Sequence, residues 1–319
     1  MPNVIRFNRW SLLVAMMITV SLIQVADLHI SVRAETFGTI FFPILAIALG
    51  LYFQRRGHII GFARTIRGLE SLGLMTAACL IFGVSTYPIL SFTSGWSDTY
   101  LIRADAMLGF NWIQLLRTVQ THPLLCSMIE FAYGSILFQS TLIIVCLSIL
   151  GRFDHAHRFV AATIVALFFT VFLVYFVPAK SAAIEFLGEG SPGLTFSSSA
   201  HVPIINSLRN GSHPPIDLNN IVGLITFPSF HASASLLYAW AAAPIRWLRI
   251  PMIILNALML FSSLILGGHY FVDVIGGSLI ALVAIRLAQL MPYKAPTKCL
   301  APMNEHSLFE SDFLPLNVR

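Results

Sequence analysis

Charged side chains are scarce in this chain. Asp, Glu, Lys and Arg make up 10% of its 319 residues, against about 25% in a typical soluble domain. Hydrophobic residues make up 57%, and the mean hydropathy is +0.80. This composition excludes an ordinary soluble protein, indicates a membrane protein, and gives no reason to expect nucleic acid as a partner.

Cysteine is also rare, with four residues. Cys79, Cys126 and Cys146 lie within apolar runs, where cysteine usually acts as a small apolar residue. Cys299 follows the last apolar run. Because no Cys/His spacing of the zinc type occurs, we expect no disulfide, no metal site and no cofactor.

Long apolar runs are what the chain has in abundance. About 20 apolar residues are needed to cross a hydrocarbon core of about 30 Å. The sequence therefore predicts an all-α, polytopic helix bundle with eight transmembrane helices. These cover approximately residues 10–30, 36–53, 70–92, 124–150, 158–177, 229–244, 250–266 and 270–290.

The distribution of Lys and Arg predicts the orientation, because cytoplasmic segments carry an excess of these residues. With a cytoplasmic N-terminus, fourteen of the nineteen cations lie inside: Arg6, Arg9, Arg55, Arg56, Arg64, Arg67, Arg152, Arg158, Arg246, Arg249, Arg286, Lys294, Lys298 and Arg319. Five lie outside: Arg33, Arg103, Arg117, Lys180 and Arg209. Both termini are thus expected in the cytoplasm.

The first apolar run is too long for a cleaved signal peptide, and no A-x-A site closes it, so a retained anchor is expected. We divide the chain into an N-terminal two-helix membrane extension (1–69), a catalytic membrane domain (70–291) and a cytoplasmic tail (292–319). Every candidate catalytic residue follows residue 177, which is why the first two helices are read as an addition.

Two predicted outer segments are unusually long. Residues 98–122 mix apolar and charged residues, which predicts one or two helices along the membrane interface. These either border a lipid entrance or simply anchor the chain through Trp96 and Trp112. Residues 178–227 form a loop rich in Ser, Gly, Pro and Asn, and loops of this length are usually functional or disordered.

Two polar motifs carry the chemistry, FPSFH over residues 227–231 and GGHYFVD over residues 267–273. On a helix, Asp273 lies one turn after His269 and can orient its imidazole, leaving the other ring nitrogen free as a nucleophile or base. Gly267 and Gly268 permit a tight turn and close approach of a ligand to the backbone.

Pro228 is suited to the first turn of a helix, where Ser229 and Phe230 would present free amides to a phosphate. His231 follows in the same turn. The charge-derived topology places both motifs, with Lys180 and Arg209, at one membrane face. A nucleophilic His backed by Asp, a second His and nearby cations fit phosphoryl transfer through a phosphohistidine intermediate, which needs no metal.

Together the two motifs resemble the type 2 phosphatidic acid phosphatase (PAP2) superfamily. The strings Phe-Pro-Ser-x-His and His-Tyr-Phe-Val-Asp are most similar to the branch that contains inositol phosphorylceramide synthases. The resemblance covers roughly residues 170–290 and implies a six-helix core. It also implies His269 as nucleophile, Asp273 as its orienting partner and His231 as general acid.

The chain departs from the phosphatase pattern at two cations. Lys180 is followed by Leu187 and Gly188 where the family has Arg-Pro, and Ser263 stands where the family has Arg. We therefore assign the phosphate-binding role to Lys180 and Arg209, with Ser229, Phe230 and Gly268. His201 and His213 are weaker candidates in the same loop.

The function expected from this pattern is cleavage of a lipid phosphoester or phosphoanhydride at the outer face, with water or an alcohol as acceptor. We expect the active site on the periplasmic side of a bacterial inner membrane. A lipid transporter and a non-catalytic lipid-binding protein are the alternatives from other classes. A transporter would carry ionisable residues near the middle of several spans, whereas the polar groups here lie at one end.

Overall fold

A computed structural model describes residues 3–31, 34–56, 62–212 and 214–293 of the chain. The described residues are almost entirely helical. Their only strands are β1 (Ile30–Ser31) and β2 (Ile216–Asp217), which pair in parallel. The helices are α1 (Val4–Val25), α2 (Ala34–Arg56), α3 (Phe62–Ser91), α4 (Asp98–Met107), α5 (Trp112–Gln120), α6 (Pro123–Gly134), α7 (Ile136–Ile149), α8 (Phe153–Val174), α9 (Ala182–Leu187), α10 (Phe196–Ser199), α11 (His201–Arg209), α12 (Phe230–Ala242), α13 (Arg246–Ile265) and α14 (Phe271–Leu290).

The protein is a multi-pass membrane protein with fewer full spans than the eight expected. In the described part of the chain, five helices are long and apolar enough to cross a bilayer: α1, α3, α8, α13 and α14. The pair α6 and α7 makes a sixth if its two halves, bent by 58°, count as one span. Five or six of the eight predicted spans are thus confirmed among the described residues.

Of the two remaining predicted spans, α12 is shorter than a bilayer requires. Helix α2 has 23 residues and is apolar over Thr36–Tyr52, so a span there stays a prediction. Helix α12 has 13 residues, and at about 1.5 Å per residue it rises roughly 20 Å. The sequence overestimated α12 because the residues at its ends are apolar, although Ser229 caps one end and Ala243–Ile245 form a turn at the other.

The bend between α6 and α7 falls at Gly134 and Ser135, a residue pair that commonly marks sharp kinks. The Ser135 hydroxyl donates to the Ala132 carbonyl at 2.5 Å and accepts from the Gln139 amide at 2.6 Å. Gln139 in turn accepts from Asn256 of α13 at 2.8 Å. Side-chain hydrogen bonds thus satisfy polar groups at the break.

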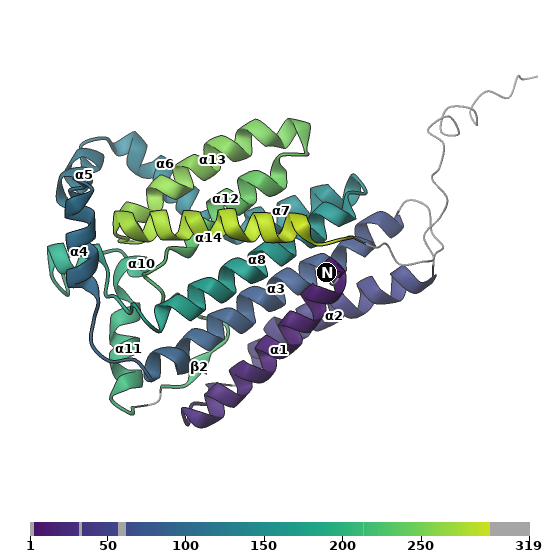
Figure 1. Ribbon diagram of the computed structural model, residues 1–319, viewed down its shortest axis with the longest axis horizontal. Helices are drawn as coiled ribbons and strands as arrows, with labels where there is room; N and C mark the ends of the chain where they lie inside the picture. Colours follow the sequence, from purple (N-terminus) through teal and green to yellow (C-terminus); the bar gives the residue numbers. More distant parts are fainter. Residues whose placement is uncertain (1–2, 32–33, 57–61, 213, 294–319) are drawn as a thin grey trace, which may run out of the picture.

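The long helices lie side by side, and the short helices α4, α5, α10 and α11 gather at one end of them (Figure 1). Helix α8 is buried along most of its length and packs against α3, α12 and α14. Helices α1 and α2 pack on α3. The division into an extension, a catalytic domain and a tail stays a prediction, and the tail beyond residue 293 lies outside the described residues.

The first and last described segments meet at the end opposite the short helices. The amide of Val4 donates to the Pro292 carbonyl at 3.0 Å. Arg9 forms an ion pair of 2.5 Å with the buried Glu70. This places the N-terminus and the end of α14 on one side, as the distribution of cations requires, although the compartment itself stays a prediction.

Helices α12 and α14 approach each other closely at Gly277. A Cβ atom added there would lie 2.1 Å from the Ser229 carbonyl oxygen and 3.1 Å from the Ala232 Cβ. The Ser233 hydroxyl donates to the Gly277 carbonyl at 2.7 Å. Small residues that allow backbones to touch are typical of helix pairs in membranes. Because α12 and α14 begin with the two sequence motifs, this contact also sets the distance between them.

We expect Gly277→Ala to lower stability by about 1–3 kcal/mol, since the added methyl group would overlap the α12 backbone. Gly38→Ala is the matched control, because Gly38 is an exposed helical glycine with no atom within 4 Å of its added Cβ. The comparison is the thermal unfolding midpoint of each purified variant in detergent. Equal midpoints for the two variants would contradict the close contact.

Candidate active site

The GGHYFVD motif forms the turn that leads into α14. His269 Nδ1 lies 3.3 Å from Asp273 Oδ2, and the same carboxylate oxygen accepts a hydrogen bond of 2.9 Å from the Tyr270 amide. His269 is 4% exposed and Asp273 is fully buried. Among the described residues, His269 Nε2 has no hydrogen-bond partner. The predicted pairing therefore exists, with the helix starting two residues later than expected.

The two glycines of the motif are required by the geometry. A Cβ at Gly267 would lie 2.7 Å from Cδ2 of the His269 ring. Gly268 has a φ of +64°, which favours glycine, and its carbonyl accepts from the Ala182 amide at 2.8 Å. Gly268 is buried against Ala183 and Ser198, so it shapes the turn rather than presenting an open surface.

Two carboxylates of α4, which the sequence analysis did not assign to the site, hold this turn in place. Asp105 accepts from the amides of Phe271 and Val272, both at 2.9 Å. These are the first amides of α14, which lack partners within the helix. Burial raises the pKa of Asp105, and the two amide hydrogen bonds oppose the rise.

Asp98 performs the equivalent task for the loop after α8. Its carboxylate accepts from the amides of Lys180 (3.0 and 3.1 Å) and Ser181 (3.2 Å) and from the Tyr270 hydroxyl (2.8 Å). Burial and the charge of Asp98 raise the pKa of Tyr270, which keeps its hydroxyl protonated as the donor. Asp98 thus connects the residue beside His269 to the loop that carries Lys180.

The sequence did contain a signal for both carboxylates. Asp98, Leu101 and Asp105 recur with helical spacing, and all three are buried in α4. The helices expected over residues 98–122 are α4 and α5, and their position along the membrane interface stays a prediction. However, Trp112 is 2% exposed and donates to the Leu264 carbonyl at 2.8 Å, so it is a core residue and the anchor role considered for it is wrong.

His231 lies in the first turn of α12 and stacks on Tyr133. The ring centroids are 4.1 Å apart and the planes differ by 10°. The hydroxyl of Tyr133 is hydrogen-bonded to Ser197. Tyr133 directly precedes the Gly134–Ser135 break, and nothing in its sequence context distinguished it from other aromatic residues in the spans.

The two motifs meet directly. The amide of Ser229 donates to the Asp273 carbonyl at 3.0 Å, and the Ser229 hydroxyl caps α12 by accepting from the Ala232 amide at 3.3 Å. His231 and His269 are close enough to interact electrostatically. Because its amide is occupied and the residue is fully buried, the expectation that Ser229 offers a free N–H to phosphate was wrong. The amide of Phe230, the other residue expected to bind phosphate through its backbone, is in the first turn of α12.

The two predicted phosphate-binding cations lie near each other around Trp96. The guanidinium of Arg209 is 4.2 Å from the ring centroid and donates to Thr93 at 2.8 Å, while the Lys180 ammonium is 6.0 Å from that centroid. Lys180 also lies 3.5 Å from both Glu185 and Glu189. The phosphate-binding role of both cations stays a prediction.

His201 is buried beside this loop. Its Nε2 donates to the Lys180 carbonyl and lies 3.3 Å from the Thr226 hydroxyl. Burial, with a smaller effect of the neighbouring His269, lowers the pKa of His201 from 6.5 to about 4. His201 therefore supports the Lys180 backbone as a neutral residue. His213 lies outside the described residues.

This arrangement provides an oriented imidazole with one free nitrogen, a second imidazole nearby and a set of backbone and cationic donors. Comparison with known families gives a match to the PAP2 superfamily over residues 99–287, more than half of the chain. The chain belongs to the PAP2 superfamily. No curated protein and no solved structure matches it.

The PAP2 match contains both motifs and the candidate catalytic residues His231, His269 and Asp273. It implies activity of the lipid phosphate phosphatase type in general, in a superfamily whose phosphatases are typically metal-independent. Within the described ranges, no group of three or more His, Cys, Asp or Glu side chains is arranged to hold a metal ion. At the position of the missing PAP2 arginine, Ser263 is buried and its carbonyl accepts from the His269 amide at 3.3 Å.

We expect Asp105→Asn to destabilise the protein by about 1–3 kcal/mol, because one of the two buried amides of α14 loses its acceptor. The turn that holds His269 should loosen with it. Arg103→Gln on the exposed face of α4 is the control. Unfolding midpoints in detergent provide the measurement, and an Asp105→Asn midpoint equal to that of the control would refute the anchoring role.

His201 should make the protein less stable as the pH falls. Its folded pKa of about 4 lies below the ordinary value of 6.5, so between these values the unfolded chain binds a proton that the folded chain excludes. The unfolding midpoint of the wild type should therefore drop more between pH 7 and pH 4.5 than that of His201→Gln, which can still donate to Lys180. Parallel pH curves would show that His201 is not excluded from protonation.

Proposed function

We propose that the protein is a membrane-embedded lipid-phosphate phosphatase or phosphotransferase that works through a phosphohistidine on His269. The observation that carries this proposal is the direct junction of the two motifs. Ser229 and Asp273 are hydrogen-bonded through their backbones, so His231 and the His269–Asp273 pair belong to one site. PAP2 membership supports the same chemistry.

In the first step, Nε2 of His269 attacks the phosphorus of the lipid phosphate, and the bond from phosphorus to the leaving oxygen breaks. His231 donates a proton to that oxygen. Asp273 accepts from Nδ1–H, which fixes the tautomer and stabilises the positive ring. The burial of Asp273 strengthens this interaction, because few water molecules compete for the carboxylate.

In the second step, water or an alcohol attacks the phosphohistidine. His231, now neutral, removes the proton of the attacking hydroxyl, and the bond between phosphorus and Nε2 breaks. His269 and His231 return to their starting protonation states, so the cycle is balanced. Only the acceptor distinguishes a hydrolase from a transferase.

The negative oxygens of the phosphate need donors throughout the reaction. The first-turn amide of Phe230 is one, since α12 presents its N-terminus to the site. We assign the charge of Lys180 to this task as well, which requires its ammonium to move from Glu185 and Glu189 to the substrate. Arg209, stacked on Trp96, is the second cation. Gly268 keeps the turn beside His269 tight.

The finer assignments follow from the sequence motifs. The PAP2-type six-helix core would comprise α3, the α6–α7 pair, α8, α12, α13 and α14, with the site on the periplasmic face of a bacterial inner membrane. The missing phosphatase cations and the His-Tyr-Phe-Val-Asp string favour a phosphotransferase related to inositol phosphorylceramide synthases. Hydrolysis is the alternative within the same mechanism.

His269→Ala should reduce turnover of a phosphatidic acid in micelles by about 10³-fold or more, because no nucleophile remains. Asp273→Asn should lose roughly 10²–10⁴-fold through the wrong tautomer. His122→Ala is the control, since His122 is an exposed histidine of the same end, and it should retain wild-type turnover. Each variant is assayed for release of inorganic phosphate and for an acid-labile phosphoprotein, and full activity of His269→Ala would exclude the proposed nucleophile.

The acceptor is identified in the same assay by adding diacylglycerol, inositol or glycerol. A transferase should release little phosphate without acceptor and transfer the phosphoryl group to a hydroxyl of one of them, which gives a phosphomonoester. Phosphate release that is independent of every acceptor would exclude the transferase assignment and leave the hydrolase.

A further inference from the structure

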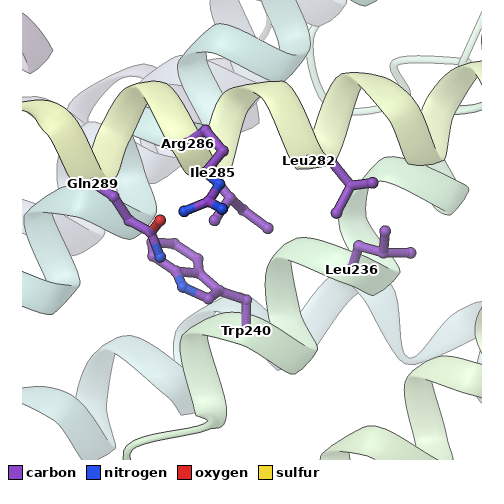
Figure 2. Close-up of a pocket in the computed structure, with 6 residues that line it drawn as sticks. All are labelled: Leu236, Trp240, Leu282, Ile285, Arg286 and Gln289. Carbon is purple, nitrogen blue, oxygen red and sulfur yellow. The ribbon is translucent and has the colours of Figure 1, made fainter.

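A groove lies between α12 and α14, towards the end of the molecule opposite the candidate active site. Its volume is about 520 Å³. The groove is lined by Leu236 and Trp240 of α12 and by Leu282, Ile285, Arg286 and Gln289 of α14 (Figure 2).

The groove is polar at one end and apolar at the other. Leu236 and Leu282 lie at one end of the view in Figure 2, and Arg286 and Gln289 extend over Trp240 at the other. The polar end is the one nearer the C-terminal end of α14. This gradient matches a phospholipid, whose acyl chain lies in the bilayer core and whose phosphate lies at the surface.

Arg286 has no protein partner in the part of the chain that the structure describes. It is exposed and is the only charged residue of α14 after Asp273. An ionisable residue inside a membrane span usually indicates a functional site, and its partner is either another residue or a ligand. Because no described side chain supplies a counter-charge here, the groove favours an anionic ligand.

The end of a helix normally repels an anion, since its free carbonyls carry partial negative charge. Here Arg158 of α8 covers these carbonyls. Its guanidinium donates to the carbonyls of Ala288 and Gln289, at 3.2 and 2.5 Å. The last turn of α14 therefore combines two guanidinium groups with neutralised carbonyls, which makes the polar end of the groove suitable for a phosphate.

We propose that this groove binds an anionic phospholipid from the leaflet at the end that holds the N-terminus. The lipid phosphate contacts Arg286 and the Gln289 amide, the glycerol region lies against the Trp240 indole, and one acyl chain follows Leu236 and Leu282. This site is separate from the candidate active site and does not depend on the proposed reaction. Since the lipid bridges α12 and α14, it also stabilises the helix pair whose other ends carry the two motifs.

The fluorescence of Trp240 can be used to detect lipid bound in this groove. The chain has five tryptophans, so the Trp240 signal is obtained as the difference in fluorescence between the wild type and Trp240→Phe in detergent micelles. Phosphatidylglycerol with brominated acyl chains should quench this signal at a several-fold lower mole fraction than brominated phosphatidylcholine. Arg286→Gln should abolish the difference between the two lipids.

Arg246→Gln is the matched control, because Arg246 is an exposed arginine at the start of α13 on the same side. It should keep the preference for phosphatidylglycerol. Equal quenching by both lipids, a preference that survives Arg286→Gln, or an equal loss in Arg246→Gln would overturn the proposal.

A second measurement avoids the tryptophan variant. Phosphatidylglycerol should raise the unfolding midpoint of the wild type more than phosphatidylcholine does, and it should lose this advantage in Arg286→Gln. Any shift from inorganic phosphate should be the same in the wild type and in Arg286→Gln, because it would come from the active site. A phosphate shift as large as that from the lipid and lost in Arg286→Gln would show a simple anion site and contradict the acyl-chain contact.

Discussion

The placement of the candidate nucleophile depends on two buried carboxylates of the short helix α4. Asp105 binds the first two amides of α14, and Asp98 joins the Tyr270 hydroxyl to the loop at Lys180. A buried carboxylate is costly unless it is hydrogen-bonded, so α4 and the turn stabilise each other. A segment more than 160 residues earlier in the chain thereby sets the position of His269.

Because the turn at His269 depends on these carboxylates, the buried polar contacts of the site are gathered at one end of the helix bundle. The remaining bundle packs through apolar and small side chains, and its glycine contact at Gly277 brings α12 directly against α14. The same contact aligns the starts of both helices. His231 is then fixed from its other side by Tyr133, which stacks on the ring from α6. The bundle supplies rigidity, and the layer of short helices supplies the polar contacts.

Much of this arrangement could be predicted from the sequence. The spacing of His269 and Asp273 indicated their pairing, and the mixed segment after residue 98 indicated interfacial helices. The number of full spans could not be predicted, because hydropathy does not show where α12 is capped. The buried roles of Asp98 and Asp105 depend on contacts with α14, and single-sequence patterns contain no information about such distant partners. For the same reason Ser229 was expected to leave its amide free, although this amide donates to the Asp273 carbonyl.

The junction between Val4 and Pro292 has a practical consequence for mapping the membrane topology. Because these residues are hydrogen-bonded, a compartment-sensitive fusion reporter attached before Val4 and one inserted at Pro292 should emerge on the same side of the bilayer. A pair of such fusions would therefore give two independent readings of one compartment. A third reporter, inserted in the loop before α12, would identify the side that faces the candidate catalytic histidines.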